Sequence, residues 1–137
     1  MHERLREAIV PTAYGITALC TFRHYGLTFD EAVQSYYGEL TLRYFRSGFT
    51  DHAAQQFTDL KYYGPLFETI AAVVYSPFLR WKYDIRHLLI AITALITIVA
   101  VGRLAKLADA DPLVAQLALV TLPQFWGHSF VNSKDIP

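Results

Sequence analysis

The feature that most constrains the fold is an uncharged run over residues 88–102, LLIAITALITIVAVG. On a helix this run is apolar on every face, so it must be buried in a protein interior or in a bilayer. Arg86 precedes it and Arg103 follows it, and cations in such positions are typical of the ends of a membrane span. We therefore predict a membrane-spanning helix over 84–107.

Two more uncharged runs, residues 8–22 and 112–126, have the same length as the run 88–102. At 1.5 Å per residue, a helix of about 15 residues covers roughly 22 Å of the roughly 30 Å hydrocarbon core. Apolar residues form 53% of the chain of 137 residues, and the mean hydropathy of +0.24 is high for a soluble domain of this size. We predict an all-α integral membrane protein with about three transmembrane helices, over 8–22, 84–107 and 112–126, the last kinked at Pro123. The alternative is a soluble helical domain with a very apolar core.

The segment between the first two spans, residues 23–83, is expected to be a long external loop that carries two helices. Thr28 and Glu31 have the spacing of a capping box, which predicts a helix over 29–47. One face of this helix is aromatic and suits a water–lipid boundary. A second helix is predicted over 66–79, whose length fits an interfacial or re-entrant helix better than a span. Both helices are expected to lie along the membrane surface.

The charges leave two topologies open. If residues 66–79 lie on the surface, the chain has three spans, and Asp30 and Asp135 fall on the same side of the membrane. If they cross, there are four spans and the two acids fall on opposite sides. The basic residues of the stretch 80–86 would then face the cytoplasm, as the positive-inside rule expects. The charge distribution alone therefore favours four spans.

Composition excludes some classes of function. The 12 basic and 12 acidic residues balance, so the chain lacks the basic footprint of a nucleic-acid-binding protein. The single Cys20 can form no internal disulfide. His87 and His128 could contact phosphate or a metal ion, but the spacing of His, Asp and Glu forms no convincing ligand set. No metal ligand is predicted.

Five short stretches occur in an order that resembles a known family. They are LTFDE at 27–31, SGFTD at 47–51, YYGPLFE at 62–68, IRHLL at 85–89 and GHSFVNSKDIP at 127–137. From about Arg23 to Pro137, the chain resembles the N-terminal third of the polyprenyl-phosphate-sugar-dependent glycosyltransferases. These are integral-membrane enzymes of the GT-C fold, related to protein O-mannosyltransferases and to the lipid A aminoarabinose transferase. None of the stretches is specific alone, whereas the ordered set is.

The resemblance implies the position of the site. In this family the first span is followed by an external loop that begins with an acidic pair, here Asp30 and Glu31. Surface helices follow, and the second span opens with an arginine, here Arg86. The third span ends at a second acidic motif on the external side, matched by Asp135 in the polar loop 127–137. The resemblance thus implies three spans, and we follow it over the charge distribution.

The implied reaction moves a sugar from a polyprenyl-phosphate donor to an acceptor hydroxyl at the outer face of a bacterial inner membrane. A hydroxyl is a poor nucleophile at neutral pH, so a carboxylate is needed as general base, and Asp30 is the candidate. Glu31 and Asp135 complete the catalytic set. The departing phosphate needs cations or a divalent metal ion to stabilise its charge. The candidate substrate-binding residues are Arg86, His87 and His128.

Plainer interpretations stay open for the same residues. Asp30 and Glu31 could simply start a helix, Arg86 could flank a span, and Asp135 could be an ordinary loop acid. The chain also has Tyr63-Gly64-Pro65 where related mannosyltransferases carry a His-Pro-Pro-like run, so acceptor chemistry is not carried over. We expect an N-terminal fragment that needs its missing C-terminal part to complete the donor cavity. The alternative function is a non-catalytic membrane scaffold or assembly module.

Overall fold

The computed structural model describes residues 2–133, and this part of the chain forms helices and no strand. The all-α prediction is therefore confirmed. The α-helices are α1 (His2–Thr21), α2 (Glu31–Arg46), α3 (Leu66–Tyr75), α4 (Lys82–Leu107), α5 (Pro112–Val120) and α6 (Pro123–Val131). Three short 3₁₀ helices connect them, η1 (Ala53–Gln56), η2 (Asp59–Tyr62) and η3 (Leu79–Trp81). The chain divides into unit 1, residues 1–25 and 87–137, and unit 2, residues 26–86.

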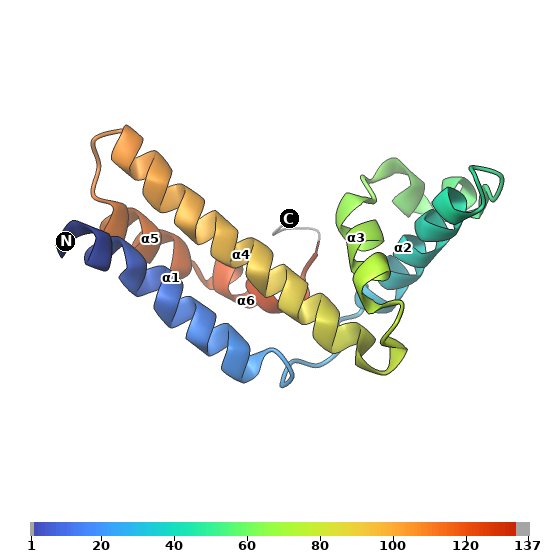
Figure 1. Cartoon of the computed structure of the whole chain (residues 1–137), viewed down its shortest axis with the longest axis horizontal. Coiled ribbons are helices and arrows are strands. Elements are labelled where there is room, and N and C mark those ends of the chain that lie inside the picture. The colour runs from blue at the N-terminus through green and yellow to red at the C-terminus, as the bar shows by residue number, and fades with distance from the viewer. Residues whose placement is uncertain (1, 134–137) are drawn as a thin grey trace. The chain divides into compact units, whose positions relative to one another are not determined.

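Unit 1 is built on α1 and α4, which run side by side, with α5 and α6 packed against them (Figure 1). Residues four apart on α1 and three or four apart on α4 form the facing stripes of a helix pair. The buried core consists of Val10, Tyr14, Ala18, Ala91, Ala94, Ile98 and Phe130. On the other side of α4, Ile92 and Ile96 are 44% and 62% exposed. An apolar surface on both sides of α4 is what a helix in lipid presents.

Among residues 2–133, one helical segment is long and apolar enough to cross a membrane. It is Leu79–Leu107, which consists of η3 and α4. The 26 residues of α4 cover roughly 39 Å, more than the hydrocarbon core. The 10 residues of α3 cover only roughly 15 Å, too little to cross.

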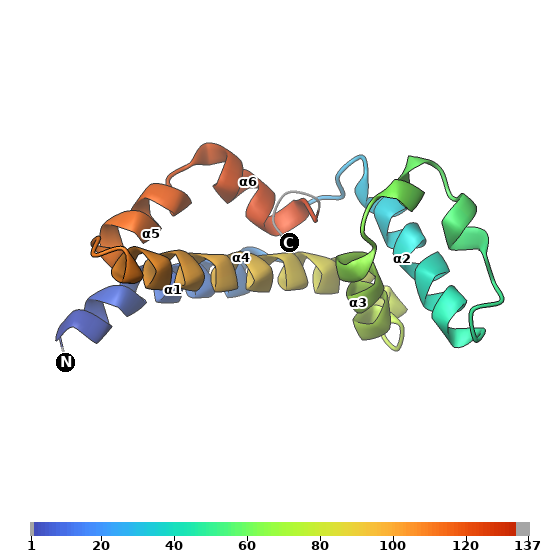
Figure 2. The same ribbon diagram turned by 90° about the horizontal axis from the view of Figure 1, so that it is seen from above.

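The predicted third span is wrong as a single kinked helix. Residues 112–126 belong to two separate helices, α5 and α6, joined at a bend (Figure 2). The break lies at Leu122, whose backbone is extended because the ring of Pro123 disfavours a helical residue before it. Pro123 then starts a new helix, where its missing N–H costs nothing. The predicted loop over 127–137 is also wrong up to Val131, which ends α6.

In unit 2, α2 packs closely against α3 because Gly38 has no side chain. A Cβ atom at this position would collide with the backbone carbonyl of Glu68. The close approach buries Ala71 and Ala72 of α3 completely. Leu40 and Tyr37, also on α2, pack on Ala54 of η1 and form a second small core.

We expect Gly38→Ala to destabilise the chain by about 1–3 kcal/mol, the usual cost of forcing atoms into a packed contact. The cost is high because the obstructing atoms are backbone. Gly102→Ala is the matched control, since its Cβ would meet the end of the flexible side chain of Gln116. Denaturant unfolding of both variants in detergent should give a larger loss for Gly38→Ala. Equal losses would contradict a backbone clash.

The start of α5 is capped by Asp111. Its Oδ1 accepts hydrogen bonds from the N–H groups of Leu113 at 2.9 Å and Val114 at 3.3 Å, and its Oδ2 pairs with Arg6 at 3.0 Å. The hydrogen bond from the Val114 N–H is the main reason why the pKa of Asp111 is lowered. A lowered pKa in the folded state means that the ionised carboxylate stabilises the fold.

The cap should therefore make stability depend on pH. Its contribution is complete above the pKa that Asp111 has in the unfolded chain, and it is lost as the pH falls through the lower folded pKa. Asp111→Ala should lower the melting temperature at neutral pH, and the difference from wild type should shrink in acid. Asp111→Asn keeps a capping oxygen and should retain most of the stability at neutral pH. A constant difference for Asp111→Ala at all pH values would contradict this role.

Candidate functional site

The candidate site of unit 2 is centred on Arg86, in the first turns of α4. Its side chain is fully buried, with 0% of its surface exposed. A guanidinium cannot lose its charge in a protein, so burial requires carboxylate partners. Two glutamates supply them, Glu68 from α3 and Glu31 from α2. Three elements of unit 2 therefore meet on one arginine.

Glu68 binds Arg86 with both carboxylate oxygens. Oε2 of Glu68 accepts from Nη1, and Oε1 accepts from Nη2 at 3.3 Å. This two-point contact matches the planar fork of a guanidinium and is the strongest geometry for such a pair. An acid in an apolar helix such as α3 is expensive in lipid unless it is paired. Arg86 is that partner, which explains why an apolar segment carries a glutamate.

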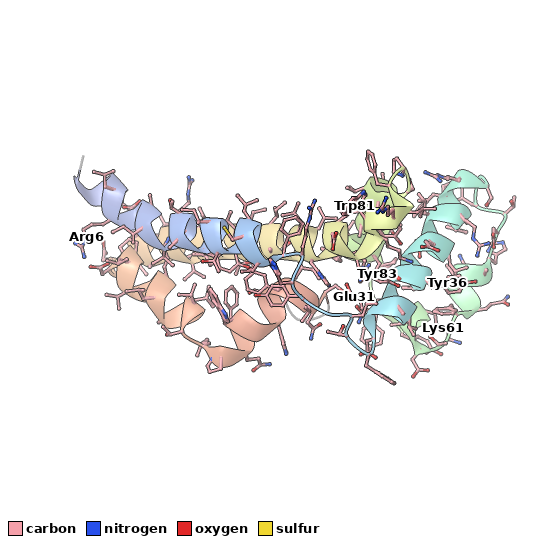
Figure 3. The ribbon with its side chains drawn as sticks, turned by 90° about the horizontal axis from the view of Figure 1, so that it is seen from below. Arg6, Glu31, Tyr36, Lys61, Trp81 and Tyr83 are labelled. Atoms are coloured by element: carbon pink, nitrogen blue, oxygen red, sulfur yellow. The ribbon has the colours of Figure 1, made fainter. Side chains whose placement is uncertain are left out.

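Glu31 lies at the start of α2 (Figure 3). Its carboxylate contacts both the backbone of Thr28 and the side chain of Arg86. Its Oε2 accepts a hydrogen bond from the backbone N–H of Thr28 at 3.4 Å, which is one half of the predicted capping box. Its Oε1 lies 3.5 Å from Nε of Arg86, and the side chain is 1% exposed. Glu31 is therefore a buried structural acid, and only the Asp30 member of the acidic pair lies at the surface.

Asp30 precedes the first residue of α2 and is exposed. Its side chain makes no capping hydrogen bond to the helix. The positive end of the α2 dipole lies at this point, where an acidic residue stabilises the helix. The acidic pair is thus divided into a buried residue that holds the loop on α4 and an exposed residue at the positive end of a helix.

A second polar cluster of unit 2 joins the same elements. The hydroxyl of Tyr75, on α3, donates to the carbonyl oxygen of Ser35 at 3.0 Å and lies 3.2 Å from Oε1 of Glu39. Lys82, at the start of α4, pairs with the same carboxylate oxygen at 2.7 Å. Burial raises the pKa of the Tyr75 hydroxyl, so it remains protonated and able to donate. This cluster supports the position of α2 and so of the acidic pair.

The remaining predicted residues lie elsewhere. His87 belongs to unit 1, where its Nδ1 is 3.3 Å from the carbonyl oxygen of Phe22 and its ring meets the edge of Tyr25. A carbonyl only accepts, so Nδ1 carries the proton in this contact. His128 lies in the last turn of α6, half-buried, next to Ser129, whose carbonyl oxygen accepts from Tyr14. Asp135 is outside the described residues.

Of the six predicted residues, Glu31 and Arg86 are in direct contact, and Asp30 precedes Glu31 in the sequence. The prediction missed that Glu68 completes the group, although a glutamate within an apolar run was the available signal. Within residues 2–133, no three His, Cys, Asp or Glu side chains gather to hold a metal ion. The group can hold a loop rigidly and leave one carboxylate at the surface.

Comparisons of the chain with protein-family models, with curated proteins and with solved structures gave no match. The interpretation of this site therefore depends on its own geometry and on the sequence motifs.

Proposed function

We propose that the chain is the N-terminal membrane module of a glycosyltransferase that uses a polyprenyl-phosphate sugar at the outer face of the membrane. The observation that carries the proposal is the divided acidic pair. Glu31 is buried on Arg86, while Asp30 is exposed at the positive end of α2. A rigidly held loop with one exposed carboxylate is what a general base acting on a bound hydroxyl requires.

In the proposed reaction, Asp30 takes the proton of the acceptor hydroxyl as its oxygen attacks the anomeric carbon of the sugar. The bond between that carbon and the phosphate oxygen breaks, and the polyprenyl phosphate leaves with the electron pair. Arg86 is already neutralised by two carboxylates, so we assign it to holding the loop instead of binding the phosphate. The exposed Arg80 of η3 is the better candidate for contacting the leaving group.

A non-catalytic membrane scaffold is the second candidate. Its support is the set of large exposed aromatic side chains in unit 2, because such side chains suit a membrane interface whether or not chemistry follows. They include Phe29, Tyr36, Phe45, Phe49, Tyr62 and Tyr63. This reading needs no role for Asp30.

The topology can be tested with single cysteines in a Cys20→Ser background. Phe29→Cys lies beside the acidic pair and is 99% exposed in the wild type, and Ala110→Cys lies in the loop after α4. A thiol reagent that cannot cross the membrane should label Phe29→Cys in intact cells and Ala110→Cys only after lysis. A third cysteine at Asp135 should be labelled from outside if the segment with α5 and α6 crosses back.

Each alternative predicts another pattern. Labelling of Phe29→Cys and Ala110→Cys from the same side would mean that α4 does not cross, and the proposed site would be lost. Purification of the chain without detergent would exclude both membrane interpretations and leave a soluble helical domain. Labelling of Asp135→Cys only after lysis would rule out one site shared by Asp30 and Asp135.

A further inference from the structure

Unit 2 contains a pocket that the proposed reaction does not use. It lies between α2 and the segment with η1 and η2, and its volume is about 390 Å³. The lining is mainly aromatic, with Thr41 and Gln55 as its uncharged polar members. The other lining residues are Tyr37, Tyr44, Phe45, Ala54, Lys61, Tyr62, Tyr63 and Pro65. Small-molecule sites typically combine such an apolar wall with few polar groups.

The lining carries one formal charge, and it is positive. Lys61 is the charged residue of the pocket wall, and no carboxylate lines it. The structure gives Lys61 a contact with the ring of Tyr62, 5.1 Å from its centroid, but no ion pair within the described part of the chain. The chemistry that complements this wall is therefore a single anionic group attached to an apolar body.

A pocket of unit 1 differs from this one in its charges. It is about 290 Å³ in volume and is lined by charged residues of both signs. Its cations already have partners, since Arg6 pairs with Asp111 and Lys106 pairs with Glu7 at 2.5 Å. Both cations of that pocket are therefore paired with carboxylates of the same pocket, so it is a poorer site for an anionic ligand.

The rim of the unit 2 pocket is exposed and aromatic. Phe45, Tyr62 and Tyr63 are 52%, 81% and 58% exposed. Figure 3 marks Lys61 on η2, in the same segment as these tyrosines. Exposed tyrosine and phenylalanine side chains around a lysine are typical of the boundary between lipid headgroups and acyl chains. The pocket thus opens where a membrane-surface unit would meet lipid.

We propose that this pocket binds the headgroup of an anionic phospholipid, with the phosphate at Lys61 and the first acyl carbons on the aromatic wall. The inference rests on the membrane placement in the proposed function, and it assigns unit 2 a specific lipid contact. Residues of α2, Tyr37 among them, form one wall of the pocket. A bound lipid would therefore stabilise the position of the helix that starts at the acidic pair.

The test uses the full chain in detergent, titrated with phosphatidylglycerol or phosphatidylcholine, and counts bound lipid by native mass spectrometry. We expect wild type to prefer phosphatidylglycerol, and Lys61→Gln to weaken that binding about fivefold, the usual contribution of one lysine near an anionic surface. Tyr62→Ala should weaken the binding of both lipids. Lys106→Gln removes the same charge from unit 1 and should change nothing.

Three results would overturn the inference. An equal loss in Lys106→Gln would mean general surface electrostatics, and no loss in Lys61→Gln would mean that lipid binds elsewhere. Displacement of phosphatidylglycerol by millimolar inorganic phosphate would mean a site for free phosphate. The assay reads binding and needs no sugar donor, so its failure is separate from a failure of the proposed transfer reaction.

Discussion

Asp30→Asn is expected to lower sugar transfer by about 10²–10⁴-fold in a full-length protein that contains this module, the usual contribution of a general base. Asparagine has nearly the same shape but cannot accept the proton of the acceptor hydroxyl. Because the Asp30 side chain is exposed and asparagine fits the same space, the fold should be unchanged. The measurement is the transfer rate in membranes together with the melting temperature of the same preparation.

Two variants control this result. Asp59→Asn removes an exposed carboxylate from η2 in the same unit and should leave the rate unchanged. Glu31→Gln removes the buried neighbour, and its loss of rate should come with a loss of stability, because Arg86 then loses a partner. Full activity of Asp30→Asn would favour the scaffold interpretation.

Arg86→Met is expected to destabilise the chain by about 3–5 kcal/mol, because it leaves two carboxylates buried against an apolar side chain. Adding Glu31→Gln and Glu68→Gln to Arg86→Met should recover much of the loss, since the triple variant buries no charge. Denaturant unfolding in detergent gives both numbers. The control is the exposed Arg80, six residues before Arg86 in the chain, and Arg80→Met should have a small effect on the free energy of unfolding.

The same variant separates two roles of Arg86. If it holds the loop, stability and transfer should fall together, and the triple variant should recover stability. If it binds phosphate, as the resemblance implies, Arg86→Met would lower transfer while the fold keeps its stability. A stable, inactive Arg86→Met protein would therefore contradict the assignment made here.

The local sequence was enough to predict two of the main helices of this chain. The predicted helix over 29–47 is α2 (Glu31–Arg46), and the predicted span over 84–107 is α4 (Lys82–Leu107). Caps, prolines and the spacing of apolar residues act within one or two helical turns, so they are visible without the fold. The sequence also marked Pro123, but as a kink within one helix, whereas the structure starts a new helix there. Proline produces either outcome, so the local sequence does not distinguish them.

The partners of the buried charges were decided by tertiary structure. Glu68 and Arg86 are 18 residues apart, on helices joined through a turn and η3, and no local rule specifies that their side chains meet. The same holds for the Lys61 pocket, whose wall combines α2 with η1 and η2. Sequence alone marked the acidic pair as one motif, whereas packing of α2 and α3 against Arg86 buried Glu31 and left Asp30 exposed. Burial depends on which helices meet, and that is a property of the folded chain.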